Sequence, residues 1–260
     1  MENDDRQRGK ILSRREALAI FGTAGAAFLA ACAGLSDAEM PTATASQSAS
    51  AALTQTLSTV ASEALPACVV KPELTEGPYY VDEELNRSDI RSDPTSGGVK
   101  DGALLALSFR VSQVGSSGCT PLQGAKVEIW HCDAAGVYSD VSDPGFNTVG
   151  QKFLRGYQET DANGDAAFVT IYPGWYSGRT VHIHFKVHND ASNQSHEFTS
   201  QLFFDDSLSD QVFTQEPYAS KGQRNTLNST DNIYNDQLVL DVSKEAEGYA
   251  ATFDIGLQMD

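Results

Sequence analysis

Positively charged side chains are scarce in this chain: 18 Lys and Arg stand against 35 Asp and Glu, a formal net charge of −17 in 260 residues. Residues 66–260 alone hold 28 acidic and 13 basic side chains, so the acidity belongs to the part expected to fold. There is no basic patch to offset it. Nucleic acid and anionic lipid are therefore not expected as partners, because both require positive charge on the protein.

Long hydrophobic runs are also lacking. The longest candidate, AIFGTAGAAFLAA (residues 19–31), is short and rich in Gly and Ala, which argues against a membrane span. It follows Arg14 and Arg15, and this order of charged, apolar and small residues predicts a cleaved export signal over residues 1–32. The arginine pair resembles a twin-arginine signal, although position 17 is Ala. LAAC, ending at Cys32, resembles a lipoprotein cleavage box, so we expect an extracytoplasmic protein with Cys32 as a candidate lipid anchor.

Residues 33–65 have no aromatic, Lys or Arg residue, and this Ala/Ser/Thr-rich composition predicts a disordered linker. Cysteine is rare, and the sequence has no C-x-x-C motif, which argues against a zinc site built from thiolates. With Cys32 assigned to the signal, Cys68, Cys119 and Cys132 remain. We prefer a Cys68–Cys119 disulfide, since both flank strands in loop-like sequence, but the other two pairings stay open.

The remaining residues, 66–260, are expected to form one catalytic domain. Short alternating or apolar segments are separated by Gly, Asn, Asp and Pro, and Asn163-Gly164 is a strong tight-turn signal. No long helical period competes, although 206–224 can hold a short helix or two. This pattern predicts an all-β fold with a β-sandwich core and long irregular loops. The expected strands are 104–111, 125–132, 166–173, 179–188, 198–205, 237–242 and 249–257.

Two histidines stand one residue apart in GRTVHIHFKVH, residues 178–188. In a strand, alternation sends Ile183 and Phe185 to one face, and His182 and His184 to the other. Their Cα atoms would lie roughly 6.6 Å apart, a spacing from which both imidazoles can chelate one metal ion. The alternative is the solvent-facing polar side of an edge strand, and H-x-H alone does not decide between them.

Two loop tyrosines are candidates to complete such a site. Tyr138 follows a strand and a Gly-containing turn, and Tyr176 lies in a Pro-Gly loop six residues before His182. A loop tyrosine is usually a packed aromatic. Phenolate is nevertheless a strong ligand for a hard trivalent metal, which offsets the cost of deprotonation. Two imidazoles and two phenolates suit non-haem Fe(III) better than zinc or copper(I).

Four blocks of sequence give the chain a recognisable resemblance. LTEGPYYVDEELNRSDIR (74–91), VEIWHCDAAGVYSD (127–140), FLRGYQETDANG (153–164) and YPGWYSGRTVHIHFKV (172–187) resemble, in order, the intradiol ring-cleavage dioxygenases. The likeness spans nearly all of 66–205 and is closer to the exported, single-polypeptide members than to the paired-subunit protocatechuate enzymes. It implies a β-sandwich that holds Fe(III) through Tyr138, Tyr176, His182 and His184.

The resemblance also implies roles. Tyr176 resembles the tyrosine that leaves the iron when a catechol binds, and Tyr138 the one that stays. Arg179 resembles an arginine beside the ring, whose fixed charge stabilises negative charge on the carbon that attacks O2; without the resemblance it would be read as a surface ion pair. Trp175 adjoins Tyr176 and is added as a substrate contact. The expected substrate-binding residues are Pro78, Tyr79, Trp175, Arg179 and Gln201.

The resemblance also implies a reaction that inserts both atoms of O2 between the two hydroxyl-bearing carbons of a catechol-type diol, giving a cis,cis-muconate-type dicarboxylate. No organic cofactor is expected. The ring substituents stay open, although the acidic domain disfavours a carboxylated substrate. Because no long amphipathic N-terminal helix is evident, we prefer a monomer over a small homo-oligomer.

Two alternatives remain from the sequence. TDANGDAAFVTIYPGWY (160–176) also resembles transthyretin-like modules, which favours a non-catalytic binding or adhesion sandwich. A zinc hydrolase using His182 and His184 is the other, but H-E-x-x-H is missing. Some residues are expected to be structural: His131 is packed, His188 and His196 are solvated, and the Asp residues of 205–236 form a solvated surface.

Overall fold

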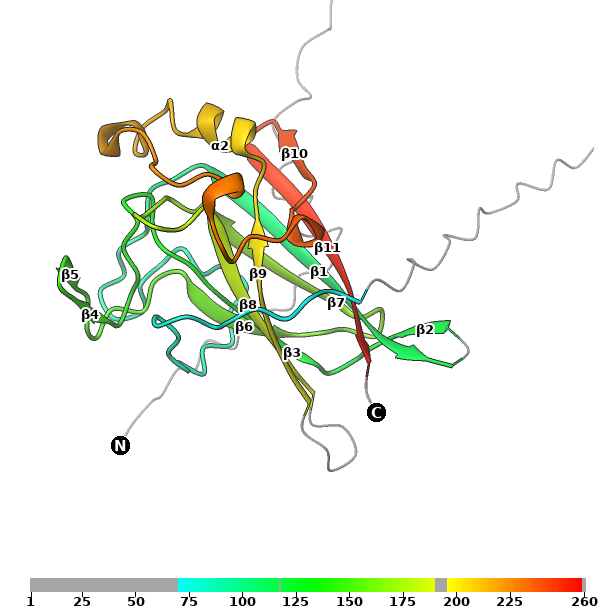
Figure 1. Cartoon of the computed structure of the whole chain (residues 1–260). Coiled ribbons are helices and arrows are strands. Elements are labelled where there is room, and N and C mark those ends of the chain that lie inside the picture. Colours follow the sequence, from blue (N-terminus) through cyan, green and yellow to red (C-terminus); the bar gives the residue numbers. More distant parts are fainter. Residues whose placement is uncertain (1–69, 117, 190–195, 259–260) are drawn as a thin grey trace, which may run out of the picture.

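The computed structural model describes residues 70–116, 118–189 and 196–258 (Figure 1). The expected signal (1–32) and linker (33–65) lie outside these residues, as does Cys68 of the preferred disulfide. Cys119 is disulfide-bonded, and Cys132 carries a buried free thiol. Within the described ranges no helix is long and apolar enough to cross a membrane.

The first sheet is built around β1 (Leu104–Gly115). On one side, β1 pairs in parallel with β11 (Gly248–Gln258), which pairs in turn with β10 (Val242–Glu245). On its other side, β1 pairs antiparallel with β7 (Asp165–Ile171) and then with β2 (Gly118–Pro121). This sheet carries no residue of the predicted site.

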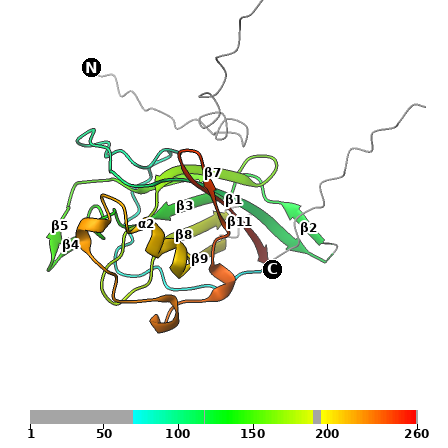
Figure 2. The same cartoon turned by 90° about the horizontal axis from the view of Figure 1, so that it is seen from above.

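The second sheet carries the two predicted histidines. Its strands are antiparallel, in the order β6 (Arg155–Glu159), β3 (Lys126–Trp130), β8 (His182–Asn189) and β9 (His196–Phe203). A short hairpin of β4 (Ser142–Asp143) and β5 (Phe146–Asn147) projects at the end of the molecule opposite β2 (Figures 1 and 2).

The core lies between the two sheets, where alternate residues of facing strands meet. The ring of Phe185 on β8 lies 5.3 Å from Phe109 on β1 and 5.5 Å from Phe253 on β11, centroid to centroid. All three are at most 3% exposed. Burial of such apolar surface on both sheets is the main stabilising term of a sandwich. The predicted all-β sandwich is confirmed.

Most of the expected strands form, with shifted ends, but the one over 237–242 is wrong. There the chain makes a 3-10 turn, η4 (Asp236–Leu238), in which the Asn235 side chain accepts a hydrogen bond from the Gln237 N–H. Leu238 and Leu240 are buried all the same. Their burial explains why apolar residues alternate in this part of the sequence as they would in a strand. The short helices expected over 206–224 are α2 (Asp206–Val212) and η2 (Ala219–Lys221).

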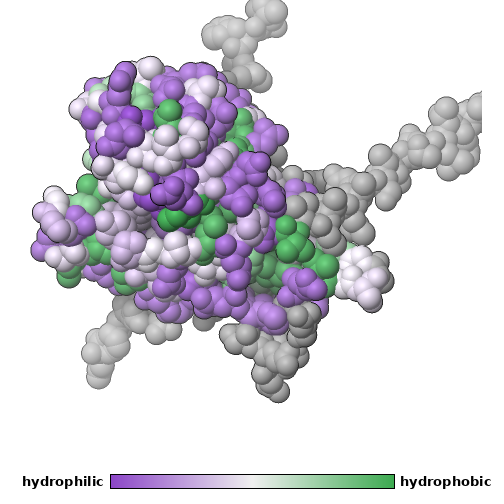
Figure 3. Space-filling model, in the orientation of Figure 1, coloured by the Kyte–Doolittle hydropathy of each residue, from purple (hydrophilic) through white to green (hydrophobic). Residues whose placement is uncertain are grey.

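The visible face of the molecule is mostly hydrophilic, with smaller hydrophobic areas between (Figure 3). His131 is packed, as expected: it is 1% exposed, and its ring nitrogens contact the Cys132 carbonyl oxygen and the Thr170 hydroxyl. The expectation of a solvated acidic surface over 205–236 is wrong for Asp231, whose side chain is 1% exposed.

Candidate metal centre

The candidate site lies on the outer face of the second sheet, away from the sandwich core. Because side chains alternate along β8, Phe185 points into the core while His182 and His184 point outward. Both histidines are nevertheless buried, at 2% and 1% exposure. The neighbouring strand covers one of them: the Trp130 ring stacks on the His184 ring at 5.0 Å with an interplanar angle of 8°. The solvent-facing alternative for H-x-H is therefore wrong.

Two loops bring the predicted tyrosines to this face. Tyr138 follows β3 through a turn containing Gly136, and Tyr176 precedes β8. Gly136 has φ +78°, and a Cβ placed there would lie 2.2 Å from the Trp175 carbonyl oxygen. Only glycine lets the two loops approach so closely. The rings of Tyr138 and Tyr176 then meet edge to face, with centroids 5.8 Å apart.

The four polar tips converge. His182 Nε2 lies 3.0 Å from His184 Nε2, 3.1 Å from the Tyr176 hydroxyl and 3.4 Å from the Tyr138 hydroxyl. His182 Nδ1 lies 2.6 Å from the Thr180 carbonyl oxygen, to which it must donate, so Nε2 presents its lone pair. One lone pair cannot serve three neighbours, and a shared cation is the arrangement that satisfies this donor set.

The protonation states agree with metal binding. Burial, aided by the charge of Arg179, lowers the pKa of His182 to about 3, and burial with the neighbouring His182 lowers the pKa of His184 well below its usual value. Both imidazoles are therefore neutral near pH 7 and can act as ligands. His184 Nδ1 is buried without a hydrogen-bond partner in the described part of the chain.

The tyrosines require a cation to ionise. Burial is the main cause that raises the pKa of both Tyr138 and Tyr176 above the usual value, with a further contribution from Tyr176 at Tyr138 and from Cys132 at Tyr176. A bound metal ion reverses this preference, because its charge stabilises phenolate. No three His, Cys, Asp or Glu side chains gather at one point in the described residues, so a metal site here depends on tyrosine. The residues present fit Fe(III).

Arg179 and Gln201 lie together beside the cluster. Arg179 Nη2 donates to Gln201 Oε1 at 2.6 Å, and Arg179 Nε donates to Asp231 Oδ2 at 2.9 Å. Gln201 Nε2 donates to the Thr75 carbonyl oxygen at 2.8 Å. This bond ties residues 70–80, here called the cover segment, to β9. Asp231 was missed from the sequence because one aspartate among many in 205–236 carries no local signal of burial.

Of the other predicted substrate contacts, Tyr79 packs against both Tyr138 and Tyr176. Its ring stacks on Tyr138 at 4.6 Å, and its hydroxyl donates to Asp143 at 2.8 Å. Burial and this carboxylate raise the pKa of Tyr79 to about 12. Trp175 is half-buried, with its indole N–H unpartnered among the described residues, whereas Pro78 is exposed.

A buried cation next to Tyr138 was also missed. Arg155 is 2% exposed and donates to the Tyr79 and Ser139 carbonyl oxygens, each at 2.7 Å. Burial lowers its pKa. The Arg155 side chain joins the cover segment, through Tyr79, to the loop that carries Tyr138. The signal for it was its place in the FLRGYQETDANG block, where only the charge and not the contacts could be read.

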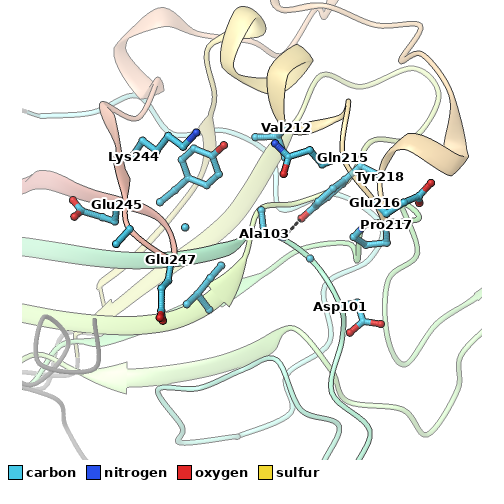
Figure 4. A pocket seen from close by; sticks show the side chains of 15 residues that line it. Asp101, Ala103, Val212, Gln215, Glu216, Pro217, Tyr218, Lys244, Glu245 and Glu247 are labelled. Carbon is cyan, nitrogen blue, oxygen red and sulfur yellow. Dashed lines mark hydrogen bonds between the residues drawn. The ribbon is translucent and has the colours of Figure 1, made fainter. Parts of the chain in front are cut away.

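A hollow of about 500 Å³ lies elsewhere (Figure 4). It is bordered by the start of β1, the end of α2 and the β10–β11 hairpin, with Asp101, Glu216, Glu245 and Glu247 among its residues. It shares no residue with the tyrosine–histidine cluster. The chemistry of the convergent side chains, rather than cavity size, identifies the candidate site.

Comparison with known proteins agrees with this geometry. The family model described as Dioxygenase matches residues 75–259. The chain is 30% identical to the protocatechuate 3,4-dioxygenase beta chain of Burkholderia cepacia, over 70% of this chain and 76% of that one. It is 37% identical to catechol 1,2-dioxygenase 2 of Acinetobacter lwoffii, but over only 45% of this chain and 46% of the relative.

A solved structure, an intradiol ring-cleavage dioxygenase from Tetranychus urticae, superposes with a TM-score of 0.64 at 29% identity, covering 74% of this chain and 95% of that one. The binding-module and zinc-hydrolase alternatives find no support in these comparisons. The matched region includes every residue of the cluster described above. The chain belongs to the intradiol ring-cleavage dioxygenases.

Proposed function

We propose that this protein is a non-haem Fe(III) enzyme that cleaves catechol-type diols with O2 to cis,cis-muconate-type dicarboxylates. The observation that carries the proposal is the approach of three polar tips to His182 Nε2 within 3.0–3.4 Å. Tyr138, Tyr176, His182 and His184 would be the ligands. Bound Fe(III) supplies a Lewis acid that lowers the pKa values of the two diol hydroxyls.

The two tyrosines have different tasks in this proposal. Tyr138 is 1% exposed and packed under Tyr79, so its hydroxyl keeps its place. Tyr176 lies on a loop and is more exposed, so its side chain can swing aside when substrate arrives. Its phenolate oxygen then takes one of the diol protons, which removes the need for a separate base.

Arg179 supplies a fixed positive charge beside the substrate ring. Its Nε and Nη2 are held by Asp231 and Gln201, while its Nη1 makes no hydrogen bond within the described residues. A preorganised donor of this kind stabilises negative charge that develops on the ring carbon as it reacts with O2. Trp175 and Tyr79 would form the walls that orient the ring and exclude water.

The ring substituents are the finer question. Relatives include a protocatechuate and a catechol dioxygenase. With 28 acidic and 13 basic side chains in residues 66–260, the domain repels a carboxylated ring, so we favour catechol and its uncharged derivatives over protocatechuate.

We also propose that the protein is exported and tethered through lipidated Cys32. The order of Arg14-Arg15, an apolar run and LAAC supports this, followed by the linker-like composition of 33–65. A chain with Cys32→Ser should move from the membrane fraction to the soluble fraction, and its continued membrane association would contradict the tether.

The proposed function is tested by visible absorption of the iron-loaded protein, before and after anaerobic catechol. We expect a tyrosinate-to-Fe(III) band that shifts to longer wavelength with catechol. The Tyr138→Phe and Tyr176→Phe variants should lose iron affinity or alter the band, whereas Tyr157→Phe, on β6 and outside the cluster, is the matched control. A protein that stays colourless with ferric iron would overturn the ligand assignment.

A further inference from the structure

Residues 221–231, here called the strap, run alongside the loop that carries Tyr176 and Arg179. Five hydrogen bonds join the two segments. Lys221 Nζ donates to the Trp175 carbonyl oxygen, and Asn225 Nδ2 donates to Ser177 Oγ at 2.8 Å. Gly178 N donates to Thr226 Oγ1 at 3.2 Å, Thr180 Oγ1 donates to Asn228 Oδ1 at 2.6 Å, and Arg179 Nε donates to Asp231 Oδ2 at 2.9 Å.

Asp231 ends this series and is the one acidic residue of the strap. Its side chain is 1% exposed, and that of Arg179 is 16% exposed. Oδ2 accepts from both Arg179 Nε and the Thr180 backbone N–H, the latter at 2.8 Å, and Oδ1 accepts from the Ile233 N–H at 2.7 Å. Three hydrogen bonds to its two oxygens hold the carboxylate in place.

The Arg179 guanidinium depends on this carboxylate, because its plane is set by Asp231 at Nε and by Gln201 at Nη2. A planar guanidinium held at two edges has little rotational freedom left, so the direction in which the unpaired Nη1 points is fixed.

We propose that Asp231 is a positioning residue for the ring-cleavage reaction: it holds Arg179 in the orientation in which Nη1 faces the substrate ring. The inference rests on the proposed function, since it assigns Arg179 to the reacting ring. Asp231 itself does not touch the substrate. Loss of its charge frees the guanidinium to rotate, and a misplacement of about 1 Å in such a group costs on the order of 100-fold in rate.

A double-mutant cycle tests the proposal on the iron-loaded enzyme with catechol. We expect Arg179→Gln to lower kcat about 100-fold and Asp231→Asn to lower it about 10- to 100-fold, with a smaller effect on KM. The double variant should match Arg179→Gln within about 2-fold, because a residue that acts through Arg179 has nothing to position once Arg179 is gone. A general structural role would make the two losses multiply.

A second readout does not need iron or activity. In 1H–15N spectra of the apoprotein, the Arg179 Nε–H signal, assigned by its absence in Arg179→Gln, should exchange slowly with solvent. It should exchange fast in Asp231→Asn and stay slow in Asn225→Ala. The latter is the control within the strap, because Asn225 is exposed and, among the described residues, its side chain hydrogen-bonds only to Ser177 and Thr226. If Asp231→Asn does not fold, Asp231→Glu keeps the charge but displaces the guanidinium, and the same loss of kcat is expected.

The outcomes separate the two proposals. An iron-free, inactive wild-type protein with a protected Arg179 Nε–H would overturn the proposed function but leave the Asp231–Arg179 contact intact. An active enzyme in which Arg179→Gln lowers kcat and Asp231→Asn does not, or in which the losses multiply, would overturn the positioning role alone. An unprotected Nε–H in the wild type would also overturn it.

Discussion

The two faces of β8 are equally buried and chemically opposite. Ile183, Phe185 and Val187 face the first sheet and are 0% exposed. His182, His184 and Lys186 face the other way and are at most 4% exposed. One strand therefore separates an apolar core from a polar cluster, and burial alone does not distinguish structure from function.

The difference lies in what covers each face. The inner face meets a regular sheet, where close packing gives a large favourable free energy. The outer face is covered by irregular segments held by specific polar bonds, such as that of Gln201 to Thr75 and that of Lys186 to Glu76. Buried polar groups cost free energy unless they are paired, so the outer face is stable only where partners are supplied. A face built this way is where a bound ion can supply the missing partner.

The largest effect is expected when a polar ligand candidate on the outer face is replaced by an apolar side chain of similar volume. His184→Leu should abolish iron binding and activity, a loss greater than the about 10- to 100-fold that an outer-shell change costs in metal affinity. The apoprotein should be at least as stable as the wild type, because the unpartnered Nδ1 is removed. Metal analysis and urea unfolding of the apoprotein measure the two effects, and a clear loss of apoprotein stability would contradict the comparison.

The complementary change is made on the inner face, one residue away. Phe185→Ala removes a ring packed between Phe109 and Phe253. We expect the free energy of unfolding to fall by about 3–5 kcal/mol. Below the unfolding transition, the iron content per folded molecule should equal that of the wild type. If the folded variant lost iron in proportion, the two faces would not be independent.

Much of this division could be read from the sequence, and the exceptions have physical reasons. Alternation in 182–188 pointed to the two histidines and the loop settings of Tyr138 and Tyr176 made these tyrosines candidates, while the resemblance to the dioxygenase family supplied the set of four ligands. Asp231 and Arg155 were not predicted, since their roles come from contacts with residues tens of positions away. Leu238 and Leu240 misled because burial under a 3-10 turn gives the same alternation as a strand.

The outer face of the second sheet also predicts a dependence on pH, through Glu128 on β3. It is 4% exposed and accepts a hydrogen bond from the Tyr80 hydroxyl at 3.2 Å. Burial raises the pKa of Glu128 to about 7, although Lys126 opposes the shift. The native state thus retains a proton that the unfolded chain releases near its usual pKa of about 4.3, and stability falls as pH rises from about 4.5 to 7.

Glu128→Gln removes this penalty while keeping an acceptor for Tyr80. Near pH 4 the variant and wild-type apoproteins should have similar stability, and at pH 8 the variant should be more stable by about 3–4 kcal/mol. Urea unfolding across this range measures the difference. Exposed Glu84, which pairs with Lys126, supplies the control: Glu84→Gln should show no such gain at pH 8. Parallel stability curves for Glu128→Gln and wild type would show that Glu128 is ionised in the native state.

The smallest effect is expected from two glycine substitutions, which separate contact with the outer face from backbone strain. Gly77 and Gly97 have nearly the same left-handed φ, +75° and +74°, so alanine should cost each about 1 kcal/mol. Only at Gly77 would the new Cβ meet the site, 3.3 Å from His184 Cε1, whereas at Gly97 nothing lies within 4 Å. Both variants should therefore lose similar stability as apoproteins, but only Gly77→Ala should bind iron more weakly, because the cover must shift away from the His184 ring. Equal iron affinity in the two variants would mean that the 70–80 segment merely overlies the histidines. Weaker binding in Gly77→Ala alone would show that this segment holds the His184 ring in place from outside the sheet, as Trp130 does from within it.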